Sequence, residues 1–514
     1  MVLRIALLFP ILLGAIGSPG EGSCLQGESA PLPTLETFKQ TLASLKGVKE
    51  KALAVQAVGW LQIKDAAWVP LLSPHLAPTS QDIDLALPLA AMESLSRFKG
   101  QPAAAQALGR ALPGYQKVPW LWKKLLAALA RVGHEMVVPV FEGYLRGTDS
   151  EAAVVAVETL AEMPPGMALE VVFREWSRAQ QNKEKAGPDV KRVNDRLAPE
   201  YYKLTKSLSG ENYPSMVEMA HWWQLKGAAF KEKAQEQERS QISQDPAPPP
   251  TALPPVLLVE LLFEESPGGE FANSGVSSVR SPRAAPAKPA PARSLSTPWG
   301  KGRGTRSLDF GKKPALSALD LETPPDYLKG LMSFTVCGWI NPRLDAEGSG
   351  GSRIVSWLGP DQSGVELVFR AGGSLQIGIN ELAAGSPSKS PGGLLPPVDE
   401  KLPDAVDRNW RFCAVTYDST AQSAQIQFYL GTTTKDATCI ATCDYGRGPL
   451  GSKSSPVVSI GNVPPAQRTT VADAMFRGLL DDVRIFGSRH DGSGALAPID
   501  IVRLQDRPPT PKKP

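Results

Sequence analysis

The apolar residues of this chain change their spacing once, at a proline-rich segment near the middle of the sequence. Before that segment they recur at three and four positions, the period of an amphipathic helix. Residues 245–255, DPAPPPTALPP, have the composition of a stiff, extended linker. Beyond it, short runs rich in Val, Ile, Phe, Trp and Thr are separated by Gly, Ser, Pro and Asp. The sequence therefore predicts a multidomain chain, with an all-α half followed by an all-β half.

The helical half is weakly self-similar over residues 34–180. Four equivalent anchor residues, Val58, Leu95, Leu129 and Leu160, recur at intervals of 31 to 37 residues. A period of this length, with a Gly- or Pro-containing turn inside it, predicts helical hairpins that each bury one face on the next. The pattern resembles HEAT-type repeats, and an irregular helical bundle is the alternative.

Residues 181–244 form a more charged extension that is also predicted to be helical. An apolar patch of Met216, Met219, Trp222 and Trp223 lies within it. Such a patch is expected to pack on the end of the helical domain, because paired Trp side chains are more often packing elements than ligand platforms.

The N-terminus has the pattern of a signal peptide over residues 1–17. Arg4 precedes a short apolar run that ends at small residues, and no second run of spanning length follows. Export to the periplasm, the cell surface or the exterior is therefore expected, with no integral membrane segment left after cleavage. An uncleaved anchor and a lipoprotein that uses Cys24 are the alternatives.

Composition limits the classes of partner. The chain is 42% hydrophobic and 21% charged, and its formal net charge of +3 is spread over 514 residues. Nothing in this balance indicates a nucleic-acid surface. The basic end of the chain, residues 505–514, is predicted to be a disordered, solvated tail.

The β half contains a set of short motifs in a fixed order, at residues 261–275, 307–311, 333–340, 410–418, 425–431 and 478–486. In this order they resemble the laminin-G-like and concanavalin-A-like lectin/glucanase domains of many exported bacterial proteins. The resemblance implies a jelly-roll β-sandwich over residues 256–504. This chain departs from the family pattern by insertions at 281–298 and 383–407, and the first of these is predicted to be a disordered loop.

The five cysteines, Cys24, Cys337, Cys413, Cys439 and Cys443, are too few for a disulfide scaffold and lack zinc-site spacing. Cys439 and Cys443 are candidates for a local bridge in an oxidising compartment. Cys337 and Cys413 fall inside apolar strands, where they are expected to act as small buried hydrophobes. A bridge between these two is the alternative.

Catalytic machinery is not evident. The related glycoside hydrolases carry paired carboxylates on one strand face, whereas the adjacent Asp481 and Asp482 would point to opposite faces of a strand. The histidines are scattered. We therefore expect no enzyme, and Glu366 and Glu381, on or beside predicted strands, remain as candidates for an unrecognised hydrolytic site.

The resemblance also implies a calcium ion at the rim of a sheet, and no other cofactor is predicted. Asp309 and Asp481 are the nearest candidates for its ligands by their position in the motif, and a hard cation favours oxygen ligands from loops and strand ends. The alternative for Asp481 is a hydrogen bond to nearby backbone.

The expected function is that of a non-catalytic exported binding or adhesion protein with a glycan or protein ligand. Trp299, Trp357 and Tyr445 are candidates for a sugar platform, with packing in the core as the alternative for each. A structural spacer or assembly component of the cell envelope, and a glycoside-hydrolase-like enzyme, are the competing hypotheses.

Overall fold

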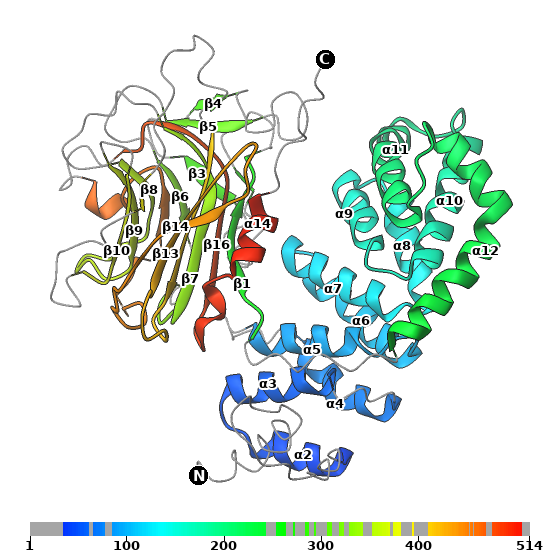
Figure 1. The fold of residues 1–514 in the computed structure, drawn as a ribbon, viewed down its shortest axis with the longest axis horizontal. Coiled ribbons are helices and arrows are strands. Elements are labelled where there is room, and N and C mark those ends of the chain that lie inside the picture. The colour runs from blue at the N-terminus through cyan, green and yellow to red at the C-terminus, as the bar shows by residue number, and fades with distance from the viewer. Residues whose placement is uncertain are drawn as a thin grey trace, which may run out of the picture. The chain divides into compact units, whose positions relative to one another are not determined.

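The computed structural model divides the chain into two compact units near residue 251. The first is helical and the second consists of antiparallel β-sheets (Figure 1), which confirms the expected multidomain fold class. The structure describes residues 34–60, 65–77, 85–242, 253–263, 271–272, 283–286, 292–294, 306–310, 318–322, 328–342, 352–370, 374–381, 393–394, 410–451, 453–455, 457–468 and 475–505. The signal peptide, Cys24, Trp299, most of the linker and most of the second insertion lie outside these residues.

The helical unit is built from short helices joined by tight turns. Its α-helices are α2 (Leu35–Ser44), α3 (Val48–Val58), α4 (Val69–Leu72), α5 (Ala86–Ser96), α6 (Pro102–Tyr115), α7 (Pro119–Val132), α8 (Val138–Leu145), α9 (Ser150–Leu160), α10 (Pro165–Gln181), α11 (Pro188–Ser209) and α12 (Met216–Ile242). The 3-10 helices η1 (Ala66–Trp68), η2 (Ser73–Leu76) and η3 (Glu135–Val137) lie between them.

Local sequence signals explain where many of these helices begin and end. The Asp149 carboxylate accepts hydrogen bonds from the backbone N–H groups of Glu151 and Ala152 and so caps α9. Proline occupies the first turn of α6, α10 and α11, where a missing N–H costs nothing. Gly210 ends α11 with a φ of 71°, a conformation that favours glycine.

Helices pack on near neighbours in the chain, and several also pack on the helix two positions further on. Thus α3 packs on α5, α8 on α9 and α10, α9 on α11, and α10 on α12. Stacked helical hairpins produce this order. Assignment to the HEAT family stays a prediction.

The charged extension 181–244 contains α11 and α12, and its apolar patch is a packing element as expected. Met219 is fully buried and Trp222 is buried. Trp223 stacks on Phe173 of α10, with ring centroids 5.3 Å apart. The patch therefore holds the last helix of the unit against α10.

The β unit contains two antiparallel sheets. The first has the strand order β14-β13-β12-β7-β16-β5-β4, with β1 also paired to β16; the second has the order β11-β10-β9-β8-β15-β6-β3-β2. The strands are β1 (Val256–Leu261), β2 (Phe271–Ala272), β3 (Arg283–Pro286), β4 (Ala292–Ser294), β5 (Ser307–Phe310), β6 (Leu319–Glu322), β7 (Ser333–Pro342), β8 (Ser352–Ser356), β9 (Val365–Arg370), β10 (Ser374–Ile379), β11 (Gly393–Leu394), β12 (Arg411–Asp418), β13 (Ile426–Thr432), β14 (Thr438–Cys443), β15 (Val457–Ile460) and β16 (Gly478–Ser488).

Strand β7 is buried on both faces along its whole length. On one face the Phe334 ring contacts Trp357 edge-on and Tyr417 at a tilt. On the other face Trp339 joins an apolar cluster with Trp410 and with Ile501 of α14 (Pro498–Gln505). The apolar residues in both registers of SFTVCGWI predict this double burial, because alternate residues of a strand point to opposite faces.

Three boundaries differ from the sequence-based expectation. Within 281–298, predicted to be a disordered loop, β3 pairs with β6 and β4 pairs with β5, because backbone hydrogen bonds to a neighbouring strand do not require apolar side chains. Leu253, placed in the linker, is buried, and its N–H donates to Asp491. Gln505, placed in the tail, is buried in α14 and donates to the carbonyls of Thr432 and Lys435.

Neither proposed disulfide fits the strand register. Cys413 lies opposite Gly338 and Cys337 lies opposite Ala414, so the two thiols point to opposite faces of the sheet. Cys439 and Cys443 are four residues apart on one strand, or about 13 Å when extended, whereas a disulfide needs Cα atoms about 6 Å apart. These four cysteines are free thiols.

We expect Trp339→Ala to destabilise the β unit by about 3–5 kcal/mol, because it leaves a large cavity in a fully buried cluster. Ile499→Ala is the control, since Ile499 is 57% exposed, and it should cost less than about 0.5 kcal/mol. Denaturant unfolding of the full chain, followed by circular dichroism in the β-sheet region, measures both. Equal effects of the two substitutions would contradict the placement of this cluster.

Candidate functional site

An open cavity of about 520 Å³ lies in the helical unit, where residues of η3, α8, α10 and α12 line it. Its apolar lining includes Val138, Pro139, Pro164, Met167 and Val171. Its charged lining consists of Glu135, Glu142, Glu170, Arg174 and Lys231. We call this cavity the helical groove.

Two glycines shape the helical groove. Gly133 turns the chain after α7 with a φ of 63°, and a Cβ there would lie 2.7 Å from Cγ of Pro164. Gly166, in the first turn of α10, lets Lys231 of α12 approach, since a Cβ at Gly166 would lie 3.1 to 3.4 Å from Lys231 atoms. The groove thus depends on close backbone approach at both glycines.

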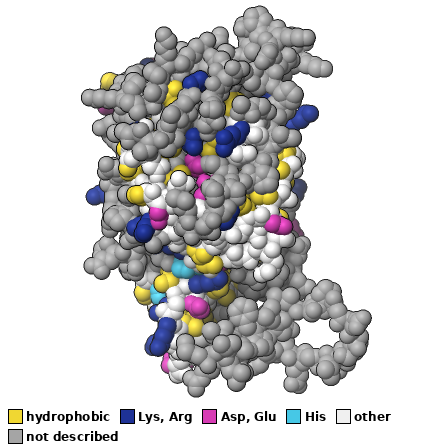
Figure 2. Space-filling view, turned by 90° about the vertical axis from the view of Figure 1, so that its left-hand side faces the viewer, with side chains coloured by type: hydrophobic (Ala, Val, Ile, Leu, Met, Phe, Trp, Pro, Cys, Tyr) yellow, Lys and Arg dark blue, Asp and Glu magenta, His cyan; other side chains and the backbone are white. Residues whose placement is uncertain are grey.

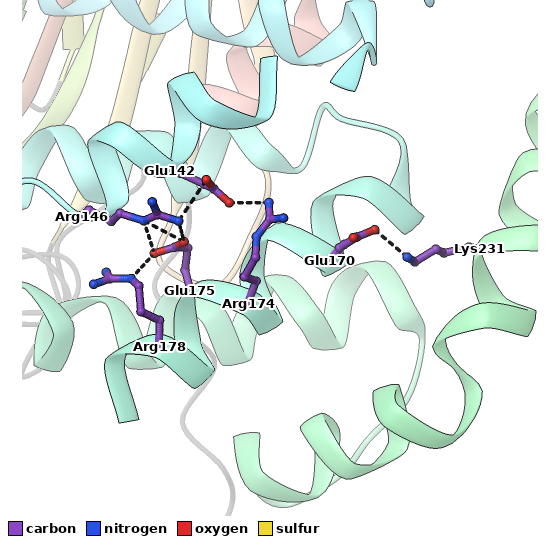
Figure 3. Close-up of polar contacts among 7 residues, drawn as sticks. All are labelled: Glu142, Arg146, Glu170, Arg174, Glu175, Arg178 and Lys231. Atoms are coloured by element: carbon purple, nitrogen blue, oxygen red, sulfur yellow. Dashed lines mark hydrogen bonds and ion pairs between the residues drawn. The ribbon is translucent and has the colours of Figure 1, made fainter. Parts of the chain in front are cut away.

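Ion pairs that start from α10 border the groove on two sides (Figure 3). Arg174 pairs with Glu142 of α8, and Glu170 pairs with Lys231 of α12 at 2.5 Å. Glu142 also pairs with Arg146 at 3.0 Å, so it joins two guanidinium groups. The Arg174 and Lys231 side chains are 47% and 38% exposed and remain accessible to a ligand.

A second charge cluster is centred on Glu175 of α10, whose carboxylate is buried while its two arginine partners are partly exposed. The Glu175 side chain is 1% exposed and accepts hydrogen bonds from Arg146 at 2.5 to 3.1 Å and from Arg178 at 2.7 Å. Burial by itself would raise the pKa of Glu175, but these two guanidinium groups outweigh it and hold the pKa below its usual range. Glu175 is therefore a structural anion that fixes Arg146 beside Glu142.

The groove offers apolar contact area and charged groups, and this combination suits ligand binding. Its described lining contains no His, Cys or Ser side chain that would serve as a nucleophile or proton carrier. His134, next to the groove, accepts a hydrogen bond from the backbone N–H of Met136 through Nδ1 and caps η3.

Sequence reasoning missed the helical groove. The four-residue spacing of paired charges on a helix occurs at Glu142 and Arg146 and again at Glu170 and Arg174. This spacing is only a weak signal of a ligand site. Lys231 lies 61 residues after Glu170. Only the packing of α12 on α10 brings these two residues together.

The predicted calcium ligands lie on one face of the first sheet. Asp309 lies opposite Leu479, and Asp481, two residues further along β16, lies opposite Trp339. Asp481 is fully buried, and its Oδ1 accepts a hydrogen bond from the backbone N–H of Asp482, as the alternative interpretation proposed. No group of three or more His, Cys, Asp or Glu residues suited to a metal occurs within the described ranges. Calcium binding here stays a prediction.

The aromatic side chains proposed as a sugar platform are packed where the structure describes them. Trp357 is fully buried against Phe334, and Tyr445 is 8% exposed, with Arg447 stacked 4.2 Å from its ring centroid. The platform hypothesis is therefore wrong for these two residues, because neither ring presents an open face.

Glu366 and Glu381 are brought together in the second sheet. Pairing places Glu366 between Gly378 of β10 and Ser356 of β8, on the face opposite Leu367. Both carboxyl side chains are at most 4% exposed, and Arg353 donates to Glu366 at 2.9 Å.

On the side of the molecule where β8, β9 and β10 lie, Lys and Arg side chains gather beside Asp and Glu (Figure 2).

None of the helices that the structure describes combines the length and the apolar character needed to cross a lipid bilayer. The longest of them, α12, carries charged residues along its length.

Comparison with known proteins identifies no family. No protein-family model and no curated protein matches the sequence. Among solved structures, similarity is found to the binding domain of botulinum neurotoxin DC in complex with rat synaptotagmin II, at 12% identity and a TM-score of 0.32 over 48% of this chain and 51% of that chain. A Trypanosoma rangeli sialidase in complex with sialic acid has 16% identity and a TM-score of 0.31 over 50% and 34%.

A structure of botulinum neurotoxin type C, whose cell entry depends upon interaction with two ganglioside molecules, has 13% identity and a TM-score of 0.31 over 48% of this chain and 50% of that chain. This chain thus spans about half of the neurotoxin chains and a third of the sialidase. TM-scores this low support neither a shared fold nor a shared function.

Glu175→Ala should destabilise the helical unit by about 1.5–3 kcal/mol, because it removes several charge-assisted hydrogen bonds. Glu170→Ala removes an ion pair whose members are 49% and 38% exposed, so it should cost less than about 1 kcal/mol. Thermal or denaturant unfolding followed by helical circular dichroism measures the difference.

The pH dependence gives a second check. A carboxyl with a lowered pKa stabilises the fold above its ordinary value of 4.5 and loses this effect as the pH falls through the folded-state pKa. The stability gap between the native chain and Glu175→Ala should therefore shrink below about pH 4. A gap that widens on acidification would show that Glu175 is not held as an anion.

Proposed function

We propose that this chain is a non-catalytic, exported binding protein, and that the helical groove is one of its ligand sites. The observation that carries the proposal is an open cavity of about 520 Å³ with an apolar floor and paired charges at its sides. Protein ligand sites commonly have such a floor with a small number of placed polar groups. Export rests on the signal-peptide pattern of residues 1–17.

A protein segment is the ligand class that suits the helical groove. Apolar side chains of such a segment would contact Val138, Pro139 and Met167. Its polar groups would replace the ion-pair partners of Arg174 and Lys231. The Glu170–Lys231 pair is half-exposed, with side chains that are 49% and 38% exposed, so opening it costs little free energy. Stacked helical hairpins present surfaces of this kind in many binding proteins.

The β unit is proposed to bind a second ligand, a glycan or a protein, through its loops or the outer face of a sheet. The support is the resemblance of segments such as 333–340 and 410–418 to laminin-G-like and concanavalin-A-like domains. Polar side chains on the outer face of the second sheet, among them Arg370 and Gln376, provide hydrogen-bonding groups that are partly exposed.

Binding of the full chain to peptide arrays and glycan arrays tests the proposal. Met167→Trp should fill the helical groove and weaken binding of groove ligands at least tenfold, with glycan binding unchanged. Leu225→Trp is the matched control, because Leu225 is on α12, is 71% exposed and does not line the groove. The unfolding midpoints of both variants should equal that of the native chain.

Three outcomes would decide against this function. If no array member binds, the chain is better described as a spacer of the cell envelope. If Met167→Trp and Leu225→Trp weaken peptide binding equally, the groove is not the site. If a bound glycan is hydrolysed, and Glu366→Gln or Glu381→Gln abolishes the hydrolysis, the chain is an enzyme.

A further inference from the structure

Glu381 is a buried carboxyl group without a hydrogen-bond partner among the described residues. It follows β10 directly, is 4% exposed, and its Oε1 accepts no hydrogen bond. Its carboxyl group occupies the space above Gly378, where a Cβ would lie 2.7 Å from Oε1 and 3.2 Å from Cγ of Glu366. Buried polar groups are nearly always hydrogen-bonded, so this exception needs an explanation.

The next residue back, Asn380, ties the end of β10 to two other segments. Its Oδ1 accepts hydrogen bonds from the N–H groups of Gly364 at 3.0 Å and Gly451 at 2.9 Å. Its Nδ2 donates to the carbonyls of Pro449 at 2.7 Å and Arg447 at 3.3 Å. Asn380 has a φ of 48°, a conformation that Asn tolerates better than most residues.

We propose that Glu381 and Asn380 form an acid-closed latch, in which neutral Glu381 stays buried over Gly378 while ionised Glu381 turns out and releases the bonds of Asn380 to residues 447–451. This device is independent of the ligands proposed above. The two residues are adjacent in the chain, so a shift of the Glu381 backbone that lets its side chain turn out also displaces the Asn380 amide.

The cost of burying an ionised carboxylate without hydrogen bonds supplies the driving force. Burial raises the pKa of Glu381 to about 7, although the positive charges of Arg447, Arg353 and Arg370 act in the opposite direction. In the open state the carboxyl regains its ordinary pKa of 4.5. The equilibrium constant for opening therefore rises by up to about tenfold per pH unit between pH 4.5 and pH 7, and it levels off above pH 7.

Charged and phenolic side chains of the described residues surround Glu381. Glu366 accepts a hydrogen bond from Arg353 of β8, and Arg370 of β9 donates to Gln376. On the remaining side, burial raises the pKa of both Tyr445 and Tyr417, so both phenols stay neutral. The ionisation of Glu381 therefore changes the charge of this region between pH 5 and pH 8.

Hydrogen exchange of the full chain, read by mass spectrometry between pH 5 and pH 8 and corrected for intrinsic rates, tests the latch. The Gly364 and Gly451 amides report on Asn380 directly. In the native chain their protection should fall at least tenfold from pH 5 to pH 8. In Glu381→Gln it should stay high at both pH values, and in Asn380→Ala it should be low at both.

Amides of β12, such as those of Ala414 and Val415, are the internal control and should keep constant protection. Equal protection of Gly451 at pH 5 and pH 8 in the native chain, or the same fall in Glu381→Gln, would overturn the latch. If Glu381→Gln does not fold, Gly378→Ala replaces it, since the added Cβ would displace the Glu381 carboxyl. Low protection in Gly378→Ala at both pH values is then expected, and unchanged protection would refute the proposal.

Discussion

The β unit depends on strand β7 and its pairing with β12 on one side and β16 on the other. Both faces of β7 are buried, so its alternating side chains serve two apolar layers at once. Phe334 belongs to the layer that contacts Trp357, and Trp339 belongs to the layer closed by α14. A slip of one residue in this register would exchange the two layers and disrupt both.

The ion pairs of the helical unit are of two kinds, which differ in how deeply the carboxylate is buried. Glu175 is enclosed by Arg146 and Arg178, which makes it part of the packing between α8 and α10. The Glu170–Lys231 pair, by contrast, remains half-exposed at the helical groove. The buried Glu175 pairs therefore stabilise the fold, whereas the exposed Glu170–Lys231 pair remains accessible to a ligand. The latch at Glu381 depends on the same distinction, because its carboxyl is buried without a hydrogen-bond partner.

Much of the fold could be predicted from spacing alone. The helix period before residue 245 and the strand runs after it predict the two units, and the apolar residues in both registers of 333–340 predict a strand buried on both sides. The site could not be predicted in the same way. Lys231, the partner of Glu170, and Arg447, whose charge acts on Glu381, are distant from them in sequence. Trp357 resembles a sugar platform until its burial is known.

The sequence by itself determined the α-then-β order, many helix ends and the alternation of strand faces, because each depends on residues within a few positions of one another. Only the tertiary structure decided that the four cysteines of the β unit are unbridged, that the helical groove forms and that Glu381 is placed to act as a latch. Register put Cys337 and Cys413 on opposite faces, packing of α12 on α10 formed the groove, and burial over Gly378 raised the pKa of Glu381. Each of these depends on which distant segment lies beside a residue, and local patterns do not contain that information.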